Sequence, residues 1–254
     1  MPQLNVSTAA FKRGAVPTIA CINKASVDFG IDFDALVAAL QKYIDEHLAP
    51  VWATPAKLVK KRAPHKDAWT MMFLDSAEPE DVNDLGLPEV DPRKVLGRHK
   101  LELGGLPLAL IFVKSTLSAK STLRARDRVS VAAAHELAEM LVDPGNNLWC
   151  EFSKGTFYAY EVCDAVEEEH FSVDGIAMSD FVYPTYFDVF RKPKSAQFDH
   201  MKKVHRPFQI LKHGYMPVKE GGKLRLKPGS AEKKRQFAGE DRRLHRIGIE
   251  KLKI

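Results

Sequence analysis

Short apolar runs in the first half of the chain predict buried strands, and a stretch of regularly spaced apolar residues predicts a helix between two of them. In that helix, apolar residues recur every three or four positions from Phe33 to Leu48. Asp32 precedes the stretch as a candidate N-cap, and Pro50 lies just beyond its end. Three short, mainly apolar runs predict the strands, 16–22, 69–74 and 108–113, and the third is continuously apolar.

A second helix is predicted at about residues 127–142, where the residues are apolar on nearly every side. A helix of this kind is typical of a buried position. Asp143-Pro144-Gly145 ends it, because proline cannot continue a helix and glycine suits the turn beyond. Residues 75–106 hold most of the prolines, glycines and acids of the middle of the chain, which predicts a long irregular connection.

The chain beyond the second helix predicts short strands. Residues 157–166 and 171–178 alternate between apolar and polar, and Asp174-Gly175 is a candidate hairpin turn. The order strand, helix, strand, strand, helix and then strands indicates an α/β (α+β) fold. We expect a mixed sheet to back the second helix.

The charge divides the chain into an acidic body and a basic extension. Residues 191–254 carry 19 Lys and Arg against 6 Asp and Glu, a net charge of +13, whereas the first 190 residues carry 19 against 27, a net charge of −8. We therefore expect a folded domain over 1–190 and a basic extension over 191–254, packed to about residue 215 and loosely ordered beyond it. Such an extension permits an anionic partner without identifying one.

Composition and patterning favour a cytoplasmic protein. Three cysteines are too few and too odd in number for a disulfide framework, which indicates a reducing compartment. No apolar run approaches the roughly 18 residues that cross a bilayer, so we expect no membrane association. The N-terminal residues lack the continuous apolar segment of a signal peptide.

The second predicted helix carries the candidate chemistry, in the sequence H-E-x-x-E at His135, Glu136 and Glu139. Residues four apart lie on one helix face, so His135 and Glu139 can both reach one ion, while Glu136 can touch a water on it. In zinc hydrolases the pattern is H-E-x-x-H, and a carboxylate can replace the second imidazole as a ligand. Because these polar groups lie on a buried helix, a metal is favoured over hydrogen bonds and ion pairs as their partner.

A third ligand must come from elsewhere in the chain. Glu161 lies 22 residues after Glu139, which resembles the gluzincin arrangement, where a glutamate completes the site. By the same resemblance, Asp164 would support the first histidine from behind the metal. Three alternatives stay open: Cys163, which would share a strand side with Glu161; His170; and Asp143, which is favoured as a supporting or helix-terminating residue over a ligand.

Taken together, HELAEMLVDP, YEVCDAVE and SDFVYPTYF resemble a family of bacterial zincin-like proteins, which are predicted metalloproteases. The resemblance covers roughly residues 15–215. It implies a zincin-like domain in which a sheet backs the metal helix and the edge strand of that sheet holds an extended peptide.

Two functions follow from these residues. The first is a metal-dependent peptidase or related hydrolase, in which Glu136 is the general base and His135, Glu139 and Glu161 hold one divalent metal. Zinc is the first expectation, and the carboxylate-rich ligands also tolerate manganese or iron. The second is a non-catalytic zincin-like protein that acts by binding, with a metal that is structural or absent.

Overall fold

The computed structural model describes residues 16–76, 97–101, 106–119 and 121–236. A five-stranded sheet in the order β2-β1-β3-β5-β4 forms one half of it. Its pairs are parallel except that of β4 with β5, which is antiparallel, so β4 is an edge strand of opposite direction. The strands are β1 (Thr18–Asn23), β2 (Lys57–Lys60), β3 (Trp69–Leu74), β4 (Gly97–Leu101) and β5 (Pro107–Phe112).

The three strands predicted from apolar runs are confirmed as β1, β3 and β5, and the α/β fold class is confirmed with them. Within the predicted irregular connection 75–106, the structure instead forms β4. Although β4 forms an antiparallel hairpin with β5, it escaped prediction because its residues are mostly polar and it lies within a segment rich in prolines, glycines and acids. The rest of that connection, residues 77–96 and 102–105, lies outside the described residues.

The first predicted helix is confirmed, with Asp32 accepting a hydrogen bond from the N–H of Ala35 as its N-cap. It continues further than expected, because Pro50 falls in the first turn of a short helix, where a proline needs no N–H partner. The segments are α1 (Phe33–Tyr43), the π-helical turn η2 (Ile44–Leu48) and α2 (Ala49–Trp52).

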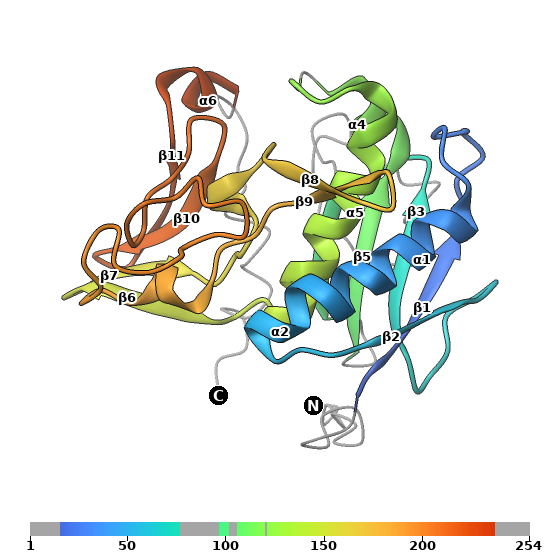
Figure 1. Ribbon diagram of the computed structural model, residues 1–254, viewed down its shortest axis with the longest axis horizontal. Coiled ribbons are helices and arrows are strands. Elements are labelled where there is room, and N and C mark those ends of the chain that lie inside the picture. The colour runs from blue at the N-terminus through green and yellow to red at the C-terminus, as the bar shows by residue number, and fades with distance from the viewer. Residues whose placement is uncertain (1–15, 77–96, 102–105, 120, 237–254) are drawn as a thin grey trace, which may run out of the picture.

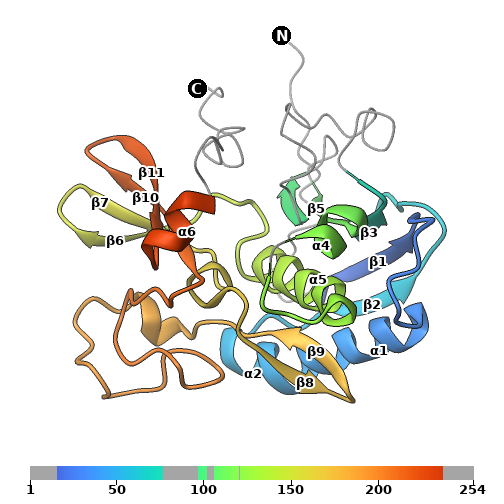
Figure 2. The ribbon, with the colours of Figure 1, turned by 90° about the horizontal axis from the view of Figure 1, so that it is seen from above.

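The second predicted helix is α5 (Ala125–Val142), which follows the short α4 (Val113–Ser118). Both α1 and α5 lie on the same face of the sheet (Figure 1). Seen from above, they lie between that sheet and the hairpin of β8 (His170–Val173) and β9 (Ile176–Ser179), which packs against both helices (Figure 2). The metal-helix candidate α5 is therefore enclosed on two sides, as its apolar composition predicts.

The predicted hairpin turn is confirmed. Asp174 and Gly175 join β8 to β9 with φ angles of 50° and 81°, the left-handed values of a tight two-residue turn. The strand predicted over 157–166 is shorter than expected. It ends at Ala159, after which the chain turns and forms the 3₁₀-helix η4 (Asp164–Val166).

A second, antiparallel sheet in the order β11-β10-β7-β6 lies beside the first (left in Figure 1). Its strands are β6 (Trp149–Ser153), β7 (Thr156–Ala159), β10 (Tyr215–Glu220) and β11 (Lys223–Pro228), and α6 (Ala231–Gln236) follows them. The sequence predicted a loosely ordered chain beyond about residue 215, whereas the structure forms β10, β11 and α6 there. Met216 and Val218 alternate into the core as β10 pairs with β7, while the basic residues of β11 are exposed. Residues 237–254 lie outside the described part.

No helix in the described part of the chain has both the length and the apolar character needed to cross a membrane.

Candidate metal centre

Helix α5 holds three of the predicted site residues, of which Glu136 and Glu139 are buried and His135 is partly buried. Glu136 and Glu139 are 8% and 4% exposed, which is unusual for carboxylates unless partners or a metal compensate the lost hydration. The helix ends at Val142 because Asp143 leaves the helical conformation and Pro144 follows. The carboxylate of Asp143 accepts hydrogen bonds from the N–H groups of Asn147 and Leu148 at 3.0 and 2.9 Å, so it shapes the turn that terminates the helix.

One cluster of possible ligands forms around His135. Its Nε2 lies 3.3 Å from Oε1 of Glu139, one helical turn later, and 3.4 Å from Oδ1 of Asp164. Asp164 begins η4, where the chain turns back toward α5. These three residues offer ligand atoms that all lie within 4.8 Å of one another.

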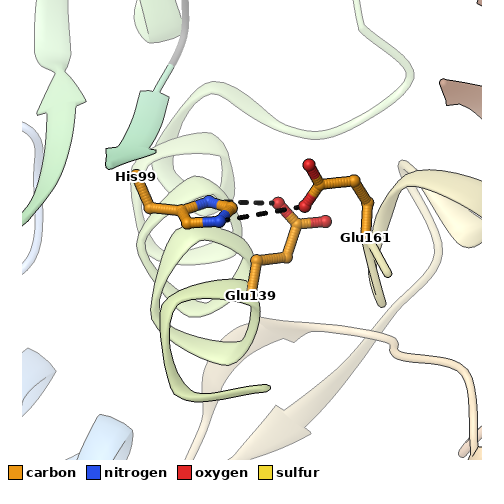
Figure 3. Close-up of side chains that lie close together, drawn as sticks. All are labelled: His99, Glu139 and Glu161. Carbon is orange, nitrogen blue, oxygen red and sulfur yellow. Dashed lines mark ion pairs between the residues drawn. The ribbon is translucent and has the colours of Figure 1, made fainter. Parts of the chain in front are cut away.

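A second cluster shares Glu139 but includes a residue from the edge strand. His99 of β4 places Nδ1 3.6 Å from Oε2 of Glu139 and Nε2 3.9 Å from Oε2 of Glu161 (Figure 3). His99, Glu139 and Glu161 are all buried, and their ligand atoms also lie within 4.8 Å of one another. The predicted partners of Glu139 are thus divided between two groups, with His135 in one and Glu161 in the other.

Sequence reasoning missed His99 because residues 75–106 were interpreted as a connection. The signal that could have found it is a period of two: His99 and Leu101 alternate with Arg98 and Lys100, as in a strand with one buried side. Antiparallel pairing with β5 places His99 opposite Ala109 and turns its imidazole toward α5.

Gly97, in the same strand, makes room for Glu136. A Cβ at position 97 would lie 2.6 Å from both Cγ and Oε1 of Glu136, closer than side-chain atoms approach one another. Oε2 of Glu136 lies 3.5 Å from Nδ1 of His99. The side chain of Glu136 is therefore positioned against the edge strand, between the backbone of Gly97 and the imidazole of His99.

The buried charges of the cluster perturb one another strongly. Burial raises the pKa of Glu139, His135 lowers it, and the nearby Glu161 carboxylate raises it again, to about 8. Burial opposes protonation of His99, but its hydrogen bond to Glu136 and the charges of Glu161 and Glu139 raise its pKa to about 9. Burial likewise opposes protonation of His135, yet Glu139 and Asp164 hold its pKa well above the usual range. Without a metal, protons on the two imidazoles thus compensate the carboxylates.

These residues fit a divalent metal. Imidazole and carboxylate are ordinary ligands for zinc, manganese and iron, and a dication can replace the protons that the histidines otherwise hold. The Nε2 atom of His99 is buried and has no hydrogen-bond partner among the described residues. A buried ring nitrogen in that state suits a metal as its partner.

The remaining sequence candidates lie in other surroundings. Cys163 donates its backbone N–H to Oε1 of Glu139 at 3.2 Å, and burial raises the pKa of its thiol well above the usual range. The thiol belongs to neither ligand group. His170 is exposed on β8, where Nδ1 lies 3.1 Å from the backbone oxygen of Glu168, and it too lies outside both groups.

The chain matches no family model, no curated protein and no solved structure. What it does must therefore be argued from the residues of this centre.

Proposed function

We propose that this protein is a metal-dependent hydrolase of the zincin-like type that cleaves peptide bonds. The observation that carries the proposal is the position of Glu136. This carboxylate lies beside the ligand groups of α5 but belongs to neither of them, so it is left available to move a proton. His135, Glu139 and Asp164, with Glu161 and His99 beside them, would hold the metal, with zinc preferred and manganese or iron as alternatives.

A dication held there would polarise a substrate carbonyl and make a nearby water more acidic. Glu136 would then act as general base, accepting the proton of the attacking water on its carboxylate and passing it to the leaving nitrogen. His99 orients that carboxylate through Nδ1, at 3.5 Å. The side chains of His135 and Glu136 are 15% and 11% exposed, the largest exposed fractions in the cluster, so solvent and substrate would approach from their side.

The edge strand supports a peptide as the substrate class. One side of β4 pairs with β5, and in the described part of the sheet the other side has no strand partner. An extended peptide can add to such an edge through its own backbone groups. It would then lie next to Gly97 and His99, against which Glu136 is positioned.

The test compares Glu136→Gln with the unchanged protein, both loaded with zinc or manganese, on a mixed-sequence peptide library read by mass spectrometry. We expect cleavage by the unchanged protein and a loss of about 10²–10⁴-fold in Glu136→Gln, because the amide cannot accept the proton. The matched control is Glu46→Gln, an exposed glutamate of η2, which should leave the rate unchanged.

Metal content and thermal stability should be the same in all three proteins. No cleavage by the metal-loaded protein, or cleavage that Glu136→Gln leaves intact, would refute the proposal.

A further inference from the structure

The carboxylate of Glu139 faces two different histidines with its two oxygens. Oε1 lies 3.3 Å from Nε2 of His135, which the same helix carries one turn earlier. Oε2 lies 3.6 Å from Nδ1 of His99, which the edge strand carries. A carboxylate that binds a single ion can do so with one oxygen, and a second imidazole beside its other oxygen is then not required. The arrangement instead matches a carboxylate placed between two cations.

Each half of the cluster is completed by its own terminal carboxylate. On the His135 side this is Asp164, whose Oδ1 lies 3.4 Å from Nε2. On the His99 side it is Glu161, whose Oε2 lies 3.9 Å from Nε2 (Figure 3). The two halves therefore have the same composition, one imidazole and one terminal carboxylate, and they share Glu139.

We propose that this centre binds two divalent metal ions, one on each side of Glu139, with Glu139 as the bridging carboxylate. This inference rests on the metal site of the proposed function and extends it. Two-metal sites in hydrolases hold their ions about 3.5–4 Å apart and divide the attacking and leaving oxygens between them. The second ion would be the one held by His99 and Glu161.

An independent observation points to a ligand on the His99 side. His99 is 4% exposed, and its Nε2 has no hydrogen-bond partner among the described residues. This atom is directed toward the Glu161 carboxylate at a separation too long for a hydrogen bond (Figure 3). An ion between the two groups would satisfy the imidazole nitrogen that the fold otherwise buries without a partner.

The balance of charge within the cluster also favours two ions. Four carboxylates meet here, from Glu136, Glu139, Glu161 and Asp164, and ionised they carry a charge of −4 around two neutral imidazoles. One dication would leave −2 buried inside the protein, whereas two dications neutralise the cluster. A buried net charge is costly, so the second ion is favoured on electrostatic grounds.

The first experiment counts ions. The full chain is saturated with manganese chloride, freed of loosely bound metal, and analysed by native mass spectrometry and elemental analysis. We expect two ions per chain in the unchanged protein and a twofold drop, to one, in His99→Ala and in His135→Ala. The control is His170→Ala, which removes an exposed histidine outside both groups and should retain two.

The second experiment needs no variant, so its result does not depend on whether a protein that lacks the buried His99 imidazole folds. The electron paramagnetic resonance spectrum of the unchanged protein with two equivalents of manganese should show the spectrum of two spin-coupled ions.

The outcomes separate the two proposals. One ion per chain with an uncoupled manganese spectrum overturns the dinuclear site and leaves the proposed hydrolase standing. No bound ion at all overturns both.

Discussion

Two clusters of buried acids lie in the described part of this fold, and only one of these two resembles a functional site. Asp180 and Asp199 are both fully buried, as deeply as any carboxylate of the metal centre. Backbone groups hold them in place. Asp199 accepts the N–H groups of Val204 and Lys203 at 2.8 and 2.9 Å, and Asp180 accepts those of Phe181 and Met201 at 2.8 and 3.1 Å.

Glu139 is buried to a similar degree but faces different partners. Its oxygens are directed at the imidazoles of His135 and His99, and the N–H of Cys163 approaches one of them at 3.2 Å. Backbone amides fix a carboxylate in one orientation and hold a loop, whereas imidazoles offer lone pairs that a metal can use. Burial of an acid is thus no guide to function by itself, and the groups around it decide.

The largest expected difference between the clusters is the response to metal. A ligand at a thousand times its dissociation constant stabilises the folded state by about 4 kcal/mol. Adding zinc or manganese should therefore raise the melting temperature of the unchanged protein by several degrees, and a chelator should reverse the rise. Glu139→Gln should abolish the shift, because both ligand groups include Glu139.

Asp199→Asn is the matched variant in the other cluster for this experiment. It should melt at a lower temperature yet keep the full metal-induced rise. An equal response of the two variants would remove the distinction between the clusters.

The next largest effect concerns the loop that Asp199 holds. Asp199→Ala removes the acceptor of two backbone N–H groups, from Lys203 and Val204, and that of Val204 is buried. We expect a loss of about 2–4 kcal/mol in the free energy of unfolding, measured by urea denaturation. The number of metal ions bound should not change. If the metal content falls with Asp199→Ala, the two clusters are coupled and the comparison fails.

The sequence predicted the half of the centre that lies on one helix. The spacing of His135, Glu136 and Glu139 fixes their common position, because any helix places residues four apart on one face. The buried character of α5 could also be predicted, from apolar residues on nearly all of its sides. The turn at Asp174-Gly175 was predictable for a similar reason, since its conformation is set by the residues themselves.

The partners that other segments of the chain bring to the residues of α5 could not be predicted from the sequence. The hairpin of β4 and β5 sets the position of His99 in the sheet, but His99 reaches Glu139 only because this edge of the sheet packs against α5, and no local pattern encodes that packing. The division of Glu161 and Asp164 between two groups has a similar origin. Extended alternation was predicted through residue 166, but the chain leaves the strand after Ala159 and turns into η4, which redirects both carboxylates.

The smallest expected effect, when it is taken over a single pH unit, is a change in the stability contributed by Asp180. Burial and the adjacent Asp199 carboxylate raise the pKa of Asp180 from 3.8 to about 9, so the folded protein keeps a proton that the unfolded chain releases. This contribution to stability is complete below about pH 4 and is lost as the pH rises toward 9, at up to about 1.4 kcal/mol per pH unit. Asp180→Asn carries a permanent donor toward Asp199 and has no such proton to lose. Its melting temperature relative to the unchanged protein should therefore climb between pH 5 and pH 9.

The control for this pH series is Asp45→Asn, an exposed aspartate of η2, whose difference from the unchanged protein should stay flat. Metal should be removed with a chelator throughout, because the centre at Glu139 titrates in the same range. A difference between Asp180→Asn and the unchanged protein that does not vary with pH would mean that Asp180 is ionised in the fold. The loop cluster would then hold two buried negative charges without a cation, and the contrast with the metal centre would have to rest on backbone donors alone.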